Sequence, residues 1–391
     1  MITIDKPYIE KMEEKTRCYC DIYFDNEKKN VWFEVDNKYG DYLVTERSDA
    51  YVIGLLNLAM RLGQDIKCLV PMSDELHYNI TTKLIPSLAK YGRSLKRIKV
   101  ECELAPALCG KGYIGTGLSC GIDSFDAIKN HYGTEYSNLN LTHLCINNVG
   151  AFNECYKEYG IDKVREIRYK EAATVANELN LPLISTDSNF YEAIPQNHYL
   201  SNTYSCCFAI YMLKKFWSKY YLASVGLDYS DFTIIDNDLE DSAHYDLLTL
   251  QCFSTSEIII YSESGEKTRI EKTMNISDFA PANKHLHVCV NKPYNCNVCT
   301  KCRRTLVSLD AIGKLDNFQE VFDIRYYKEN INDYYKWLVR QHLNHDLMNE
   351  PVYQKLLTRG SFRQIANREK LLFPLKKIAY KLLGIMKRQN K

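Results

Sequence analysis

The chain has 391 residues, 46% of which are hydrophobic, and its formal net charge at pH 7 is +1. This length predicts two or three domains with substantial cores, and the balanced charge excludes a general preference of the whole chain for nucleic acid. No run of 18 apolar residues is present, so the sequence predicts no membrane-spanning helix. The fifteen cysteines and the absence of a signal-peptide pattern indicate a protein of the reducing cytoplasm.

Residues 1–105 are predicted to form a small α+β unit. Hydrophobic alternation in 18–24 and in 31–35, on either side of a polar stretch, predicts a β-hairpin. Apolar spacing predicts two helices and one short strand, at 50–62, 74–91 and 66–70. No catalytic set assembles in this unit, so its role as an adaptor, a lid over a substrate or an oligomer surface stays open.

Residues 106–320 alternate between strand and helix patterns, which predicts an α/β domain with a parallel sheet and helices on its faces. The predicted strands are 113–118, 141–149, 181–186 and 221–225. The predicted helices between them are 124–131, 161–179 and 202–220. Sheets of this class bind ligands at the carboxyl ends of their strands.

A tight turn between the first strand and the first helix contains Ser119, Gly121 and Ser124. Backbone N–H groups in such a turn, together with a helix N-terminus, make a site for anions, and phosphate is the usual anion. Gly121 lacks the Cβ that would block a close approach, and the serine hydroxyls add donors. Asp123 repels a bare phosphate, so we expect it to hold a metal ion that bridges phosphates. The alternative is an ordinary strand–turn–helix with serine caps.

The segment from Ser119 to Ser124 resembles the Ser-Gly-Gly-x-Asp-Ser signature of the PP-loop ATP pyrophosphatases, the adenine nucleotide alpha hydrolase-like superfamily. The resemblance implies a HUP-like α/β fold that binds ATP and Mg²⁺ and cleaves ATP to AMP and pyrophosphate. It also implies that a carbonyl or carboxylate oxygen is adenylated for attack by nitrogen or sulfur. Cys120 stands where the family has its first glycine, and a left-handed backbone would strain a cysteine there.

Polar residues follow two of the other predicted strands. The third strand runs into Asp187, and the fourth runs into Gly226 and Asp228. Clusters of this kind are often plain turns. Because the carboxyl ends of parallel strands share one edge of the sheet, these residues are also candidates for contacts with ribose, base or a second substrate.

Four cysteines stand close together in the sequence: Cys289, Cys296, Cys299 and Cys302. Two overlapping C-x-x-C turns and a fourth thiolate close a tetrahedral shell around Zn²⁺, and a closed shell predicts structural rather than catalytic zinc. The basic residues at 301, 303 and 304 offset the charge of such a centre. An iron–sulfur cluster, a redox pair, and replacement of Cys289 by His285 or His287 stay open.

A PP-loop turn followed by this cysteine spacing resembles the 7-cyano-7-deazaguanine synthase branch of the superfamily. That resemblance covers about 110–315 and implies structural zinc and conversion of a carboxylate with ATP and ammonia. Gly226 and Asp228 are similar to a polar segment of that branch, and Lys272, with Arg269 nearby, stands where the branch has a lysine before its cysteines. The sequence after residue 231 departs from the branch. The chain also resembles uncharacterised PP-loop proteins of polysaccharide gene clusters.

Together these features predict an ATP-dependent ligase that activates a small carboxylate or amide oxygen for ammonia or another nitrogen donor. Asp123, Lys272 and Arg269 are the predicted catalytic residues. A sulfur transferase that uses Cys120 or the Cys206–Cys207 pair is one alternative. A nucleotide-sensing scaffold without turnover and a nucleic-acid-binding zinc protein are the others. The sequence does not fix the oligomeric state.

Residues 321–391 are predicted to form a helical tail with a basic end. The stretch 371–391 contains six lysine and arginine residues and no acid, and its apolar residues follow helical spacing. A cationic amphipathic helix of this kind can lie on an anionic membrane surface. The alternative, which we favour, is a terminal helix docked on the protein body.

Overall fold

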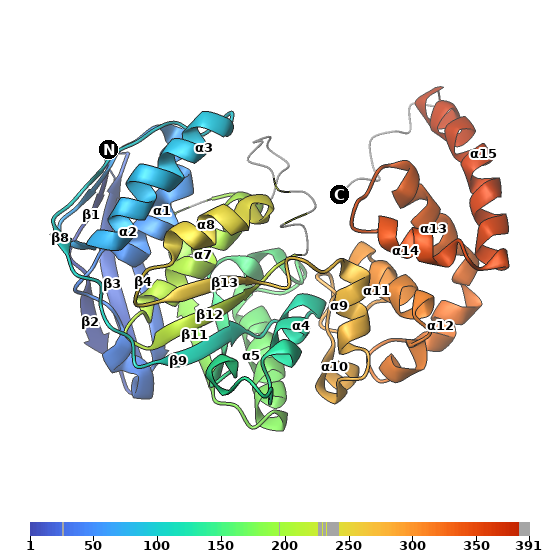
Figure 1. Ribbon diagram of the computed structural model, residues 1–391, viewed down its shortest axis with the longest axis horizontal. Helices are drawn as coiled ribbons and strands as arrows, with labels where there is room; N and C mark the ends of the chain where they lie inside the picture. Colours follow the sequence, from blue (N-terminus) through green and yellow to red (C-terminus); the bar gives the residue numbers. More distant parts are fainter. Residues whose placement is uncertain (26, 195, 226–228, 230–231, 233–241, 383–391) are drawn as a thin grey trace. The chain divides into compact units, whose positions relative to one another are not determined.

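The computed structural model describes the chain except for residues 26, 195, 226–228, 230–231, 233–241 and 383–391, and except for the side chains of 154 and 374–382. The chain divides into two compact units, Met1–Glu266 and Lys267–Lys391 (Figure 1). Each unit is described by itself below.

Five neighbouring strands of the first unit's sheet are parallel. They are β9 (Tyr113–Gly117), β10 (His143–Asn148), β11 (Leu183–Ser188), β12 (Trp217–Ala223) and β13 (Ile259–Glu263). Their order across the sheet is β13-β12-β9-β10-β11, and each neighbouring pair is parallel. The first strand of this parallel region, β9, lies at its centre. The chain then adds β10 and β11 on one side of β9 and β12 and β13 on the other. The predicted α/β class with a mostly parallel sheet is confirmed.

Helices cover both faces of these strands (Figure 1). One face carries α4 (Ile122–Asn130) and α5 (Ile161–Glu178), and the other carries α7 (His198–Met212) and α8 (Asp246–Phe253). This arrangement follows from right-handed crossovers, because a connection that moves in the opposite direction along the sheet places its helix on the opposite face. The reversal between β9 and β12 is the topological switch point of the sheet.

The N-terminal strands extend the same sheet rather than forming another one. Strand β4 (Glu27–Asp36) pairs antiparallel with β11 through Val35 and Thr186, and with β3 (Lys15–Phe24) in the predicted hairpin. The remaining strands in this part are β1 (Ile2–Ile4), β2 (Tyr8–Lys11), β5 (Ile66–Cys68) and β7 (Val100–Glu101), with a separate pair β6 (Met72–Ser73) and β8 (Leu104–Ala105). The boundary between the two compact units lies at 266/267, whereas the sequence analysis placed domain boundaries at 105 and 320.

The predicted helices of the N-terminal segment are present. Helix α1 (Asp49–Leu62) ends at Gly63, whose φ of 70° is the left-handed conformation that glycine adopts without strain. The second predicted helix consists of α2 (Asp74–Asn79), a π-helical turn (Ile80–Leu84) and α3 (Ile85–Tyr91). Helix α1 packs on α7, so the apolar face read from the sequence is buried against the sheet's own helices.

The predicted helix at 202–220 is wrong at its C-terminal end. Helix α7 stops at Met212, and β12 already begins at Trp217. Trp217 lies against Gly115 of β9, where a Cβ would meet the indole ring at 2.6 Å. The segment from 213 to 220 reads LKKFWSKY, and its mixture of aromatic residues and lysines does not by itself separate a helix from a strand. Strand β13 and the short helix α6 (Phe190–Ala193) were not predicted.

The described residues of the second unit contain helices and no strand. The helices are α9 (Arg269–Ile276), α10 (Ala280–His285), α11 (Thr300–Ala311), α12 (Ile324–Glu329), α13 (Ile331–Leu343), α14 (Glu350–Leu356) and α15 (Gly360–Leu382). Asp310 ties several of them together, because its carboxylate accepts hydrogen bonds from Tyr327, Tyr335 and Arg359. In the part of the chain that the structure describes, no helix is both long and apolar enough to cross a membrane.

Candidate functional site

The predicted phosphate turn lies between β9 and α4, at the carboxyl end of the central strand. Leu118 donates its backbone N–H to Cys145 of β10, and Gly121 is the residue before the first turn of α4. The hydroxyl groups of Ser119 and Ser124 are 3.2 Å apart, and Ser124 Oγ donates to the carbonyl of Gly121 at 3.1 Å. Hydrogen bonds of the two serines therefore hold the turn together. The first N–H groups of α4 have no partner within the helix and point along its axis toward the turn.

Cys120 carries the strain in this turn. Its φ of 56° lies in the left-handed region, whereas Gly121 has an ordinary φ of −87°. The residue that would benefit from being glycine is thus Cys120, where the resembled signature has one. Its side chain is 1% exposed, and burial raises the pKa of the thiol, so this sulfur is a small buried hydrophobe.

Replacing Cys120 separates backbone strain from side-chain packing. Both Cys120→Gly and Cys120→Ala remove the buried sulfur, but only glycine removes the Cβ that makes a left-handed φ unfavourable. We expect Cys120→Gly to be more stable than Cys120→Ala by about 1 kcal/mol, measured as the difference in free energy of unfolding in urea. Equal stability of the two variants would show that the turn is not left-handed at this position.

Arg168 of α5 lies beneath the turn and was not predicted as a site residue. Its guanidinium donates to the backbone carbonyl of Ser119 and, at 2.7 Å, to Glu171. The arginine side chain is 10% exposed, so this is a nearly buried cation next to a proposed anion site. The sequence held a signal for it: Arg168 falls at helical spacing between Val164 and Ala172, on the face of α5 that should be apolar.

The same helix reaches the polar end of β11. Arg165, one turn before Arg168, forms an ion pair with Asp187, and Asn148 of β10 donates to the same carboxylate at 2.6 Å. Burial raises the pKa of Asp187, against the effect of these two partners. The Oδ1 atom of Asn148 is buried and has no hydrogen-bond partner among the described residues. Helix α5 thus contacts two predicted site residues, Ser119 and Asp187. The bond from Asn148 of β10 to Asp187 adds a residue that was not predicted.

The other predicted site residues are placed differently. Gly226 and Asp228 follow β12 in the chain and lie outside the described residues. Lys272 and Arg269 belong to α9 of the second unit, where Lys272 is fully buried. Their part in a reaction therefore stays a prediction. Asp123 lies half exposed in the first turn of α4, next to the serine pair.

The four predicted cysteines come together in the second unit. Their Sγ atoms, in Cys289, Cys296, Cys299 and Cys302, all lie within 4.8 Å of one another. Two of the separations are 3.9 and 4.0 Å. Four sulfurs at about 2.3 Å from a tetrahedral Zn²⁺ would be about 3.8 Å apart, so the cluster is compatible with zinc.

Hydrogen bonds around the cluster hold the cysteine loop in shape. Asn295 accepts from the backbone of Cys289 and donates to two carbonyls, and Tyr334 donates to the carbonyl of Asn297 at 2.8 Å. Asn297 takes a left-handed φ of 62°, which asparagine tolerates. Ring nitrogen Nε2 of His287 is hydrogen bonded to a backbone carbonyl, which favours Cys289 over this histidine as the fourth ligand.

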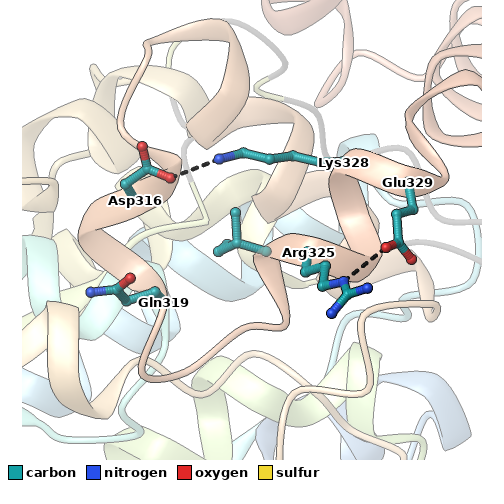
Figure 2. A pocket seen from close by; sticks show the side chains of 6 residues that line it. Asp316, Gln319, Arg325, Lys328 and Glu329 are labelled. Atoms are coloured by element: carbon teal, nitrogen blue, oxygen red, sulfur yellow. Dashed lines mark hydrogen bonds and ion pairs between the residues drawn. The ribbon is translucent and has the colours of Figure 1, made fainter.

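One surface hollow of the second unit lies between α12 and the residues before it. Figure 2 shows Asp316 paired with Lys328 and Arg325 paired with Glu329 around it, at 3.0 and 2.9 Å. Each charge in these two pairs already has an exposed partner of opposite sign. This hollow therefore offers little excess charge to a ligand.

No family model, curated protein or solved structure matches the chain. The likeness to the PP-loop superfamily thus depends on the residues of the turn and the cysteine spacing alone.

Proposed function

We propose that this protein is an ATP-dependent enzyme of the PP-loop pyrophosphatase type, which adenylates a carboxylate or amide oxygen and releases pyrophosphate. The observation that supports this most is the position of the turn 118–124. The segment that resembles the phosphate signature follows the central strand of a five-stranded parallel region, at the switch point where such sheets bind nucleotides. A chance match to the signature could lie anywhere in the chain, so its position at the switch point supports the proposal.

The residues of the turn suit a triphosphate with Mg²⁺. In the proposal, backbone N–H groups at the α4 N-terminus hold phosphate oxygens, and Gly121 N–H and the hydroxyls of Ser119 and Ser124 exchange their hydrogen bonds within the turn for bonds to phosphate. The half-exposed carboxylate of Asp123 offers the oxygen ligand that Mg²⁺ prefers. Bound Mg²⁺ would neutralise phosphate charge. The guanidinium of Arg168 beneath the turn holds the carbonyl of Ser119, and its charge is balanced by Glu171.

The acceptor is activated at the polar ends of β10 and β11 in this proposal. Asn148 and Asp187 lie there. The side-chain oxygen Oδ1 of Asn148, which has no hydrogen-bond partner among the described residues, is an acceptor suited to a ribose hydroxyl or an amine. Lys272 and Arg269 belong to the second unit, and their catalytic part stays a prediction from the sequence.

Nitrogen is favoured over sulfur as the attacking atom. Burial raises the pKa values of the thiols of Cys120 and Cys207, and a buried neutral thiol is a poor nucleophile. The four clustered cysteines are proposed zinc ligands and so are not free to carry sulfur. A scaffold that binds nucleotide without turnover is the second candidate, favoured by the strained cysteine at position 120.

Calorimetric binding of a non-hydrolysable ATP analogue with Mg²⁺ tests the proposal without knowledge of the acceptor. We expect Gly121→Val to weaken binding at least tenfold, which is about 1.4 kcal/mol, because its side chain enters the phosphate position. A Cβ at Gly121 would meet only Ser119 Oγ, at 3.3 Å, so the variant should fold.

Gly360→Val, where a Cβ meets nothing within 4 Å, is the matched control and should bind like wild type. No binding by folded wild-type protein would overturn the ATP assignment. If the analogue binds, pyrophosphate release with candidate carboxylates and ammonium separates the enzyme from the scaffold.

A further inference from the structure

The two compact units carry opposite charge, which the net charge of the chain conceals. Residues 1–266 contain 26 lysine and arginine side chains and 38 aspartate and glutamate side chains, a formal charge of −12. Residues 267–391 contain 24 and 11, a formal charge of +13. Such an asymmetry between the parts of a chain points to a polyanionic partner of the basic part.

A groove in the second unit concentrates part of this charge. It has a volume of about 590 Å³ and lies among α11, α13 and α15. This is within the size range of small-molecule sites, so the groove can receive a nucleotide-sized group as well as an ion. The side chains that line it include Arg303, Lys336, Trp337, Arg340, Arg368 and Glu369.

Only two of the four cations in the groove are neutralised. Arg340 pairs with Glu369 at 2.6 Å, and Lys336 pairs with Asp333 at 3.0 Å. For Arg303 and Arg368 the structure gives no ion pair with any acid in the part of the chain that it describes. Two guanidinium groups therefore remain to receive anionic oxygens, unlike the fully paired hollow of Figure 2.

The cysteine cluster fixes the position of Arg303. This residue directly follows Cys302 in the first turn of α11, where backbone N–H groups of Cys299 and Cys302 donate to cysteine sulfurs. The guanidinium lies over the ring of Tyr334 at 5.7 Å. Its Nε atom is buried and has no hydrogen-bond partner among the described residues. A buried N–H group that lacks a partner, on a guanidinium whose position is fixed, indicates a place where a ligand or a water molecule would bind.

We propose that this groove binds single-stranded nucleic acid, with phosphates on Arg303 and Arg368 and a base stacked on Trp337. A partly exposed tryptophan that lines the same groove as the guanidinium groups is the combination that single-strand binding uses, because every base offers a flat face and every linkage a charge. A lipid surface is the less suitable partner, since a concave groove presents these groups inward. The inference depends on the second unit alone and is independent of the ATP proposal.

Fluorescence anisotropy with labelled single-stranded RNA and DNA of about 16 nucleotides tests the inference on the full chain. We expect binding at about 50 mM salt that weakens steeply as salt rises. The double variant Arg303→Gln/Arg368→Gln should bind at least tenfold more weakly and lower the slope of log K against log salt by about 1.4. Trp337→Ala should lose about fivefold to a hundredfold, and Trp337→Phe should retain most of the affinity.

The matched control removes the same charge from the paired hollow. Arg325→Gln/Lys328→Gln should bind within about twofold of wild type, since both cations already have acidic partners. Zinc content and circular dichroism show whether each variant is folded. Equal losses in the groove and control variants would overturn the groove assignment, as would absence of binding at low salt. Binding only to vesicles of equal phosphatidylglycerol and phosphatidylcholine would replace nucleic acid by a membrane. Comparing the two oligonucleotides tells RNA from DNA.

Discussion

Cys299→Ser is expected to abolish zinc binding and to unfold the second unit. The four sulfur atoms lie within 4.8 Å of one another, and hydrogen bonds of Asn295 and Asn297 are among those that shape the loop that carries three of them. Without a metal, four thiols at this separation gain little from one another. With Zn²⁺, the binding free energy becomes folding free energy, on the order of 10 kcal/mol for small structural sites.

The second unit depends on this centre because the cluster begins its central helix. Helix α11 starts directly after Cys299, and α9, α13 and α14 pack on α11. Loss of the metal therefore loosens the element around which the unit is built. Strong chelation of wild-type protein should produce the same loss of helical circular dichroism as the substitution.

Metal analysis by mass spectrometry gives the direct measurement, with one zinc per chain expected for wild type and less than about a tenth for Cys299→Ser. Cys109→Ser is the matched control, because Cys109 is exposed and stands outside the cluster. Iron in place of zinc, with visible absorption, would identify an iron–sulfur centre. A folded, metal-free wild type would contradict the assignment altogether.

Arg168→Met is expected to have the largest effect in the first unit. The substitution removes the donor to the carbonyl of Ser119 and leaves Glu171 without the guanidinium it pairs with. Breaking one side of a largely buried ion pair costs about 3 kcal/mol, which lowers the Tm of the first unit by about 6 to 12 °C. In the proposed function it also weakens ATP binding at least tenfold, because the turn loses its support and the charge of Glu171 near it loses its counterion.

Calorimetry of unfolding and of nucleotide binding separates the two effects. Lys170→Met, two residues along the same helix and exposed, should change the Tm by no more than about 2 °C. Arg168→Lys keeps the charge but cannot span Ser119 and Glu171 together, so it should fall between wild type and methionine. If Arg168→Met unfolds no more easily than Lys170→Met, the buried pair does not support the turn.

The two proposals assign separate tasks to the two units. The acidic first unit would bind and cleave ATP, and the basic second unit would hold a polyanion through a groove that Arg303, next to the cysteine cluster, helps to line. The experiments test the two proposals separately, since Gly121→Val is expected to weaken binding of the ATP analogue and Arg303→Gln/Arg368→Gln to weaken binding of nucleic acid. A nucleic acid that also stimulates pyrophosphate release would indicate that the acceptor oxygen belongs to that polymer.

Local signals in the sequence determined much of this protein. Alternation predicted the hairpin of β3 and β4, Gly63 marked the end of α1, and the C-x-x-C spacing predicted the cysteine cluster. In each case the residues that decide the structure stand within a few positions of one another. Hydrogen-bond patterns, caps and loop spacing act over that range, so the chain itself carries the information.

Only the tertiary structure decided which distant residues share a site. The pairing of β4 with β11 joins the N-terminal segment to the central sheet, and one helix face brings Arg168 to Ser119 and Arg165 to Asp187. The boundary between α7 and β12 was misread because the mixed aromatic and lysine residues at 213–220 show no period that distinguishes a helix from a strand. Charge neutralisation in the groove likewise depends on packing among α11, α13 and α15, since a sequence shows which charges exist and only the fold shows which of them meet.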